Sequence, residues 1–248
     1  VGVDGFNEII TAINAMAKEL AETRTLRTDF IANVSHELKT PLAVIGNYAT
    51  MLRSPHITPQ EREEYAKAIS QASHNLAQLI TNILRLNKLE KQQIFPKTEE
   101  FDLGEQLCAC LLQFEDAWER KGLNIETDIQ DDVSIRSDGE LLSLVWNNLI
   151  SNAVKFTPEG GTVKVSLTAS GDSVTVTVSD TGCGMTAETG KHIFEKFYQG
   201  DTSHATQGNG LGLALVKRVV DILYGEISVH STLGEGSTFT VTFKGELP

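Results

Sequence analysis

A histidine, two charged residues, a hydroxyl and a proline lie close together in residues 36–42. Neutral imidazole is a good nucleophile near neutral pH, because its unperturbed pKa is about 6.5. If one ring nitrogen of His36 attacks an electrophile, Glu37 can orient the ring and accept the proton of the other nitrogen. Thr40, one helical turn along, is placed to hold a water for the reverse hydrolysis. A lone histidine is more often an ordinary surface residue, so this interpretation depends on the rest of the chain.

A second group of polar residues falls within residues 147–156. Asparagine is a poor helix former, so three asparagines within six residues of one predicted helix indicate a function. Asn148, Asn152 and Lys155 share one helix face at i, i+4 and i+7. Amide oxygens suit Mg2+, and the ammonium group of Lys155 can bind a phosphate. A plain polar helix face is the alternative.

Asp180 directly follows a predicted strand and begins a D-x-G-x-G pattern with Gly182 and Gly184. Glycines let the backbone approach a ligand closely. A carboxylate would repel phosphates, so we interpret Asp180 as the acceptor of a hydrogen bond from an adenine amino group. Taken alone, the pattern also describes many ordinary turns.

Gly208, Gly210 and Gly212 open a predicted helix. Glycine backbone at a helix N-terminus is a ready anion site. The spacing is not G-x-G-x-x-G and no strand immediately precedes it, which disfavours a dinucleotide fold. The absence of G-K-[ST] from the sequence excludes a Walker loop. Residues 199–207 are polar and small, as in a mobile lid over a ligand.

Two helices with narrow apolar seams are predicted before residue 96. In the first, the apolar spacing falters near Thr23 and Arg27 and resumes over residues 30–52. His36 lies beside this seam and should be exposed. Pro41 cannot donate to the carbonyl of Glu37, so we expect the helix to be loosened or kinked there.

Two prolines in residues 54–59 predict a turn. At the end of this turn Thr58 is the predicted cap of a second helix, which has Pro59 at its first position. This helix carries a heptad seam, Tyr65, Ile69, Ala72, Leu76, Leu79, Ile83 and Leu86. Two narrow seams bury little alone, so we expect a homodimeric four-helix bundle. An intramolecular hairpin docked on the C-terminal domain is the alternative.

From Pro96 onward the pattern changes to mixed α and β. Helices are predicted over residues 103–120, 138–156 and 211–223, the second capped by Asp138. A short strand or helix entry is predicted at residues 101–103, and strands over residues 123–129, 133–135, 162–169, 173–179, 226–231 and 237–243. This mixture predicts an α+β sandwich, and domains at residues 1–22, 23–95 and 96–248.

The net charge is 21 − 33 = −12, which argues against a nucleic-acid partner. Three cysteines without a C-x-x-C pair indicate neither a disulfide framework nor a zinc site, and fit a reducing cytosol. No apolar run in the sequence approaches the roughly 18–20 residues that span a bilayer. Because the chain begins with Val1 and enters a helical pattern at once, we interpret it as a piece of a longer protein.

Over nearly all its length, the chain resembles the cytoplasmic core of a bacterial two-component sensor histidine kinase. The family's boxes are recognised, in order, at residues 30–42 (H box), 147–157 (N box), 180–185 (first glycine box), 193–198 (F box), 208–213 (second glycine box) and 234–237 (third glycine box). Together they are far more specific than any one alone. Residues 5–20 resemble the end of a HAMP signalling helix, which implies sensor and transmembrane segments upstream.

This resemblance implies a helical hairpin forming a dimeric four-helix bundle, followed by a Bergerat or GHKL-like α+β ATP-binding domain. His36 would be the phosphoacceptor, Glu37 its acid/base partner and Thr40 a residue for dephosphorylating the response regulator. Asn152 would hold Mg2+. The ATP pocket would be formed by Asn148, Asn152, Lys155, Asp180, Gly182, Gly184, Gly208, Gly210, Leu211, Gly212 and Ser237.

The implied function is ATP-dependent autophosphorylation of His36 and phosphotransfer to an aspartate in the receiver domain of a response regulator, with phosphatase activity. The implied location is the cytoplasmic portion of a bacterial inner- or plasma-membrane protein, joined to the membrane only through segments outside this chain. Two alternatives are an ATPase or clamp of the GHKL type, which leaves the H box unexplained, and an ATP-binding regulator without kinase activity. One departure from the family is Gln199, where an arginine is frequent; another is Tyr224, in place of a small residue.

Overall fold

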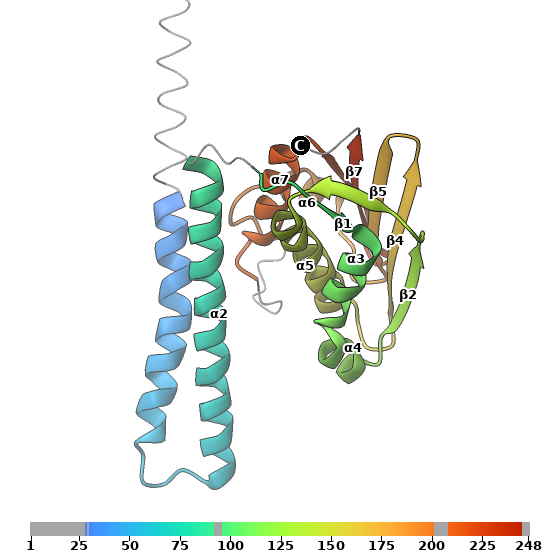
Figure 1. The fold of residues 1–248 in the computed structure, drawn as a ribbon. Helices are drawn as coiled ribbons and strands as arrows, with labels where there is room; N and C mark the ends of the chain where they lie inside the picture. The colour runs from blue at the N-terminus through green and yellow to red at the C-terminus, as the bar shows by residue number, and fades with distance from the viewer. Residues whose placement is uncertain (1–27, 29, 92–95, 201–207, 245–248) are drawn as a thin grey trace, which may run out of the picture. The chain divides into compact units, whose positions relative to one another are not determined.

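The computed structural model describes residues 28, 30–91, 96–200 and 208–244. Its contacts divide the chain into two compact units, Val1–Ile80 and Thr81–Pro248 (Figure 1). The domain limits expected from the sequence, at residues 22/23 and 95/96, remain predictions. Residues 1–22, which resemble the end of a HAMP helix, lie outside the described residues. None of the described helices is long and apolar enough to cross a membrane.

The first unit is a helical hairpin. One helix occupies residues 30–52 and continues through Pro41, so the proline does not end it, and the kink stays a prediction. The second helix, α2 (Pro59–Lys91), begins with the predicted cap and extends into the second unit. Thr58 Oγ1 accepts a hydrogen bond from the Glu61 N–H at 3.2 Å, and a Glu61 carboxylate oxygen accepts one from the Thr58 N–H at 2.8 Å.

The predicted seams face the inside of this hairpin. Ala72 and Leu79 are buried, and the rings of Tyr48 and Tyr65 lie 5.2 Å apart between centroids, joining the two helices. Other large apolar side chains of the hairpin remain uncovered in the single chain: Ile31, Leu42, Met51 and Ile80, each at least 44% exposed. One hairpin therefore buries only part of its apolar surface.

The second unit is an α+β sandwich, as predicted. Its elements are β1 (Glu99–Asp102), α3 (Leu103–Leu112), α4 (Glu115–Lys121), β2 (Asn124–Ile129), β3 (Ser134–Ser137), α5 (Gly139–Phe156), β4 (Thr162–Ser170), β5 (Ser173–Asp180), α6 (Ala187–His192), α7 (Gly212–Ile222), β6 (Glu226–Thr232) and β7 (Gly236–Lys244). The main sheet has the order β2-β4-β5-β7-β6, with β2 parallel to β4 and the other pairs antiparallel. Strands β1 and β3 form a small antiparallel sheet.

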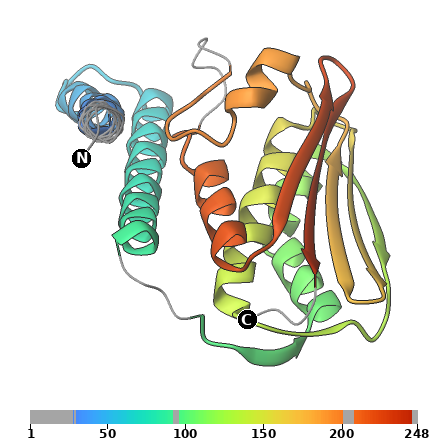
Figure 2. The same cartoon turned by 90° about the horizontal axis from the view of Figure 1, so that it is seen from above.

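Helices α3, α5 and α7 cover one face of the main sheet (Figure 2). The alternating apolar residues of the central strands are buried beneath them: Val163, Val165, Leu167, Val176, Val178, Phe239, Val241 and Phe243. Trp146 of α5 is fully buried, and its indole N–H donates to Gln106 of α3 at 3.0 Å. This core fixes α5, the helix that carries the asparagines.

Two elements differ from the sequence predictions. The helix expected over residues 103–120 is two helices, because the backbone leaves helical geometry at Phe114 (φ −105°, ψ 12°) without a proline or glycine to signal it. Helix α6 was not predicted, since six residues are too short to show a period. It begins after Thr186, whose hydroxyl accepts from the Thr189 N–H at 3.1 Å.

Candidate functional site

His36 projects from the helix of the first unit with 72% of its side chain exposed, as expected for a residue beside the seam. Its Nδ1 lies 3.8 Å from Oε1 of Glu37, whose side chain is 29% exposed. Thr40 Oγ1 donates to the carbonyl of His36 at 3.4 Å. The imidazole is therefore accessible to a second reactant, with one carboxylate beside it.

The remaining predicted site residues lie in the second unit, several of them on α5. Asp138 caps this helix as predicted: its Oδ1 accepts from the Leu141 N–H at 3.0 Å. The amide Nδ2 of Asn148 donates to the Leu144 carbonyl at 2.7 Å, which leaves Oδ1 as the free end of the side chain. Asn152, one turn along, is half-buried. Burial, aided by the positive charge of Lys121, lowers the pKa of Lys155.

The second glycine segment lies against this face of α5. A Cβ placed on Gly208 would lie 3.0 Å from Nζ of Lys155, and one on Gly212 would lie 2.7 Å from Oδ1 of Asn148. The start of α7, a lysine ammonium and an amide oxygen thus converge, a combination that fits phosphates with a hard cation. The side chain of Leu211 is fully buried in the core, so only its backbone borders this region.

Asp180 ends β5, where it pairs in register with Ser237 of β7. Burial raises the pKa of Asp180, while hydrogen bonds from the N–H groups of Gly182 and Ser237 act in the opposite direction. The Gly182 bond to Oδ1 is 2.8 Å long. A partly buried carboxylate held in this way suits recognition of an amino group.

The first and third glycine segments pack backbone against backbone. Gly184 has φ +61°, and a Cβ there would overlap the carbonyl oxygen of Thr232. Gly236 has φ +123°, and a Cβ there would overlap the carbonyl oxygen of Asp180. Only glycine permits both approaches, so these residues set the shape of the Asp180 loop.

Ser231 fastens the same two segments together. Its Oγ accepts from the Met185 N–H at 2.8 Å, donates to the Gly236 carbonyl at 2.9 Å and lies 3.0 Å from Oγ of Ser237. Ser237, predicted in the pocket, is thus engaged with β6 through its hydroxyl. Sequence reasoning missed Ser231, because a serine in an alternating strand carries no distinguishing signal.

The F box is bound to the second glycine segment. The Phe197 N–H donates to the Gly210 carbonyl at 2.8 Å, with both residues in the left-handed region at φ +63° and +62°. Gln199, the departure from the family pattern, donates through Nε2 to the Gly208 carbonyl at 3.0 Å. These bonds hold Gly208 and Gly210 beside the F box. The other residues of the expected lid, 201–207, lie outside the described residues.

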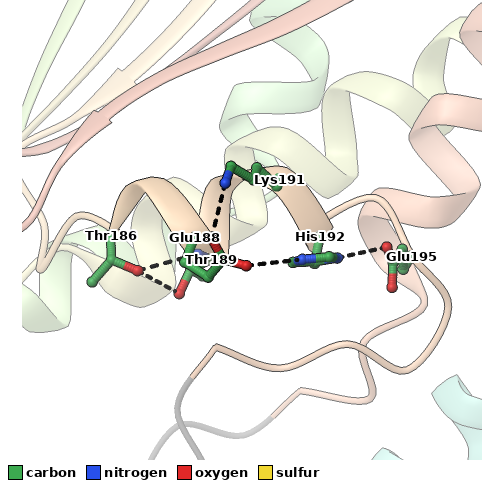
Figure 3. A network of polar contacts seen from close by, with 6 residues as sticks. All are labelled: Thr186, Glu188, Thr189, Lys191, His192 and Glu195. Carbon is green, nitrogen blue, oxygen red and sulfur yellow. Dashed lines mark hydrogen bonds and ion pairs between the residues drawn. The ribbon is translucent and has the colours of Figure 1, made fainter.

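Charged side chains of helix α6 and of the F box form a network (Figure 3). His192 lies between two carboxylates, with Nδ1 2.7 Å from Glu195 and Nε2 3.4 Å from Glu188, and Lys191 also pairs with Glu188 at 3.0 Å. The hydrogen bond with Glu195 is the main cause of the raised pKa of His192. A cavity of about 230 Å³ between α6 and β6 adjoins Lys191 but is lined by none of the predicted nucleotide residues.

Lys121, which the sequence analysis did not single out, contacts the end of α5. Its Nζ donates to the carbonyls of Val154 (2.8 Å), Lys155 (2.8 Å) and Thr157 (2.9 Å). These acceptors lie 33 to 36 residues away in sequence, so no local pattern signals the contact.

Within the described part of the chain, no three His, Cys, Asp or Glu residues lie close enough together to hold a metal ion. A magnesium site would therefore be built from amide oxygens such as those of Asn148 and Asn152, together with the phosphates of the nucleotide. Mg2+ usually keeps several waters and binds substrate phosphates in this manner, so the donor set fits.

Comparison with known proteins gives the following matches. The model of the histidine kinase-, DNA gyrase B- and HSP90-like ATPases matches residues 137–247, and that of the His Kinase A (phospho-acceptor) domain matches residues 26–92. Heme sensor protein HssS of Staphylococcus saprophyticus is 32% identical over 241 residues, which cover 97% of this chain and 52% of HssS. The chain thus spans about half the length of this relative.

Two solved structures share the fold. Full-length ShkA in complex with AMPPNP has a TM-score of 0.64 and 28% identity, covering 88% of this chain and 46% of ShkA. Histidine kinase ThkA in complex with response regulator protein TrrA has a TM-score of 0.74 and 21% identity, covering 90% of this chain and 63% of ThkA.

Proposed function

We propose a function for this chain from the finding that it belongs to the bacterial sensor histidine kinases. It transfers the γ-phosphoryl group of ATP first to His36 and then to an aspartate of a response regulator. Its two matched domains are those of a protein-histidine kinase. The observation that carries the residue assignment is the exposed His36, with Glu37 beside it, inside the phospho-acceptor domain.

In the first step a neutral ring nitrogen of His36 attacks the γ-phosphorus of ATP. The nitrogen–phosphorus bond forms while the bond to the bridging oxygen breaks, and ADP leaves. Glu37 orients the imidazole and takes up the proton of the other ring nitrogen. Lys155 and the backbone N–H groups at the start of α7 offset the negative charge of the phosphates.

The remaining nucleotide residues bind and orient ATP. Asp180 accepts a hydrogen bond from the adenine amino group, and the glycines at 182, 184, 208, 210 and 212 let the backbone approach the nucleotide. Asn152, with Asn148 close by, would hold Mg2+, which supplies positive charge at the phosphates. ShkA, whose structure contains AMPPNP, supports a nucleotide in this domain.

In the second step the phosphoryl group passes from His36 to a carboxylate oxygen of the receiver aspartate. Thr40 then positions a water for the reverse hydrolysis. The solved complex of ThkA with TrrA supports a response regulator as the partner. ATP as the donor supports a cytoplasmic location for this core, and we infer that it is attached to a membrane through segments outside this chain.

A second copy of the chain packs against the hairpin and covers its exposed apolar side chains. The side chains of Ile31, Leu42, Met51 and Ile80 support a homodimer, because one hairpin leaves them uncovered and a four-helix bundle of two hairpins can bury them.

The test is incubation of the chain with γ-labelled ATP and Mg2+, comparing the native sequence with His36→Gln. We expect acid-labile, base-stable label that is absent from the variant. Label that persists in His36→Gln would mean that another residue is the nucleophile. Bound ATP without label in either protein would instead favour an ATP-binding regulator, and steady ATP turnover that survives the substitution would favour an ATPase.

The magnesium assignment has a separate test. Asn152→Ala should abolish labelling and remove the dependence of ATP affinity on Mg2+ while the circular dichroism spectrum is unchanged. Asn124→Ala, at an exposed asparagine of β2, is the control and should label normally. Near-normal labelling of Asn152→Ala would contradict the assignment.

A further inference from the structure

At the end of α5, a side chain from another helix donates hydrogen bonds to the backbone carbonyls. The last carbonyls of a helix have no partner inside the helix. Here the Ala153 carbonyl accepts from the Thr157 N–H at 3.0 Å, but the next helical donor would be Pro158, which has no N–H. The chain also leaves helical geometry at Thr157 (ψ 128°), so the carbonyl of Lys155 loses its helical donor too.

Lys121 supplies the missing donors. An ammonium group has three N–H bonds, and the three carbonyls of Val154, Lys155 and Thr157 accept from it at 2.8–2.9 Å. A backbone hydrogen bond joins the same two segments, because the Gly160 N–H donates to the Lys121 carbonyl at 3.0 Å. The end of α4 and the end of α5 are therefore joined through one side chain whose hydrogen-bonding capacity is filled.

The turn that Lys121 holds borders two parts of the proposed nucleotide site. Lys155 leaves this turn toward Gly208, where a Cβ would lie 3.0 Å from its Nζ. Phe156 turns its carbonyl toward Gly182, where a Cβ would lie 2.6 Å from that oxygen. A shift of this turn would displace the ammonium group of Lys155 from Gly208.

We propose that Lys121 is a positioning residue for ATP binding, which acts by holding the last turn of α5 so that Lys155 faces the second glycine segment. The inference rests on the phosphate-binding role of Lys155 in the proposed function. After burial, the positive charge of Lys121 is the second cause of the lowered pKa of Lys155, so the two ammonium groups interact electrostatically.

A double-mutant cycle on the full chain tests this. ATP affinity is measured by calorimetry, in the presence of Mg2+, for the native chain, Lys121→Met, Lys155→Met and the double variant. We expect Lys121→Met to weaken ATP binding by about tenfold, equivalent to about 1.4 kcal/mol. In the Lys155→Met background the same change should alter the affinity by less than about twofold, because the residue through which Lys121 acts is gone.

The control is Arg120→Met, which removes the adjacent cation. Arg120 is bonded within its own helix, through Nε to the Asp116 carbonyl at 2.9 Å, and should leave ATP affinity within about twofold. Should Lys121→Met not fold, as judged by circular dichroism, Lys121→Arg replaces it in the cycle. Arginine keeps the charge but spreads its donors over a planar fork that cannot meet three converging carbonyls.

The outcomes separate the two claims. An equal loss of affinity from the Lys121 substitution in both backgrounds, or no loss in the native background, overturns the positioning role alone. An unchanged affinity of Lys155→Met overturns the phosphate-binding role of Lys155 in the proposed function, and the inference with it.

Discussion

At the scale of single residues, Asp180 holds a carboxylate partly away from water at the end of β5. Its pKa is raised above the ordinary value, so the folded state carries a penalty when the group is ionised. That penalty is present at neutral pH and disappears as the pH falls through the raised pKa. The residue proposed to read adenine is thus also a residue that costs stability.

Asp180→Asn should therefore be more stable than the native chain at pH 7, because an amide has no charge to bury. The advantage should shrink as the pH is lowered from 7 toward 4, because the native carboxyl takes up a proton more readily in the folded chain than in the unfolded one. ATP affinity should fall at least about tenfold, because an amide cannot present two acceptor oxygens. Urea unfolding at both pH values and calorimetry with ATP check this; a less stable variant at pH 7 would contradict it.

His192 gives a second pH-dependent prediction, in which stability again falls as the pH rises. Because Glu195 and then Glu188 raise its pKa, the protonated form is favoured in the folded state. Its contribution to stability is fully present below the unfolded pKa and is lost as the pH rises through the raised folded value. NMR titration of the ring should show a pKa above 6.5 that falls in Glu195→Gln. Glu188→Gln, at the longer contact, should lower it less; an equal or larger effect would contradict the assignment.

Some contacts were predictable because their partners are near in sequence. The caps Thr58 and Asp138 bond to residues three positions along, a spacing visible in the sequence. The contacts of Lys121 and Ser231 join segments that only the folded sheet and helices bring together. The exposure of His36 and the location of Asp180 at the end of a strand were predictable, but the burial that shifts the pKa of Asp180 was not, since it depends on tertiary packing.

At the scale of elements, the close packing of the glycine segments predicts which glycines tolerate a side chain. Gly184→Ala would overlap the Thr232 carbonyl and also strain a positive φ. We expect it to destabilise the second unit by more than about 3 kcal/mol, or prevent its folding, and to abolish ATP binding.

Gly234→Ala is the matched control for this change. Gly234 also has a positive φ, +84°, but nothing lies within 4 Å of a Cβ there. Only the conformational cost of about 1–2 kcal/mol should remain, with ATP affinity nearly unchanged. Thermal unfolding of both variants measures the difference. Equal destabilisation of Gly184→Ala and Gly234→Ala would show that the backbone overlap has no role.

The individual strands of the sandwich were predictable, whereas their order was not. Alternation of apolar residues identifies β4, β5, β6 and β7 one at a time. It does not show that β7 inserts between β5 and β6, because alternation is the same whichever neighbour a strand takes. This order brings Ser237 opposite Asp180.

At the scale of the whole molecule, the uncovered apolar residues of the hairpin predict assembly. Ile80→Glu would place a charge in the proposed bundle and should weaken the dimer at least about tenfold without loss of helix content. Gln78→Glu, at an exposed polar position of the same helix, should not change the association. Sedimentation equilibrium measures both; an unchanged mass for Ile80→Glu would contradict the four-helix bundle.

The place of β7 in the sheet has a consequence for how the protein is made. A ribosome delivers the chain from its N-terminus, so β4, β5 and β6 emerge before the strand that joins β5 to β6. Until β7 emerges, the edge of β5 is open and Asp180 lacks its partner Ser237. A nascent chain therefore presents an accessible His36 while the proposed nucleotide site is still incomplete, so the proposed phosphorylation within one chain would have to wait for β7.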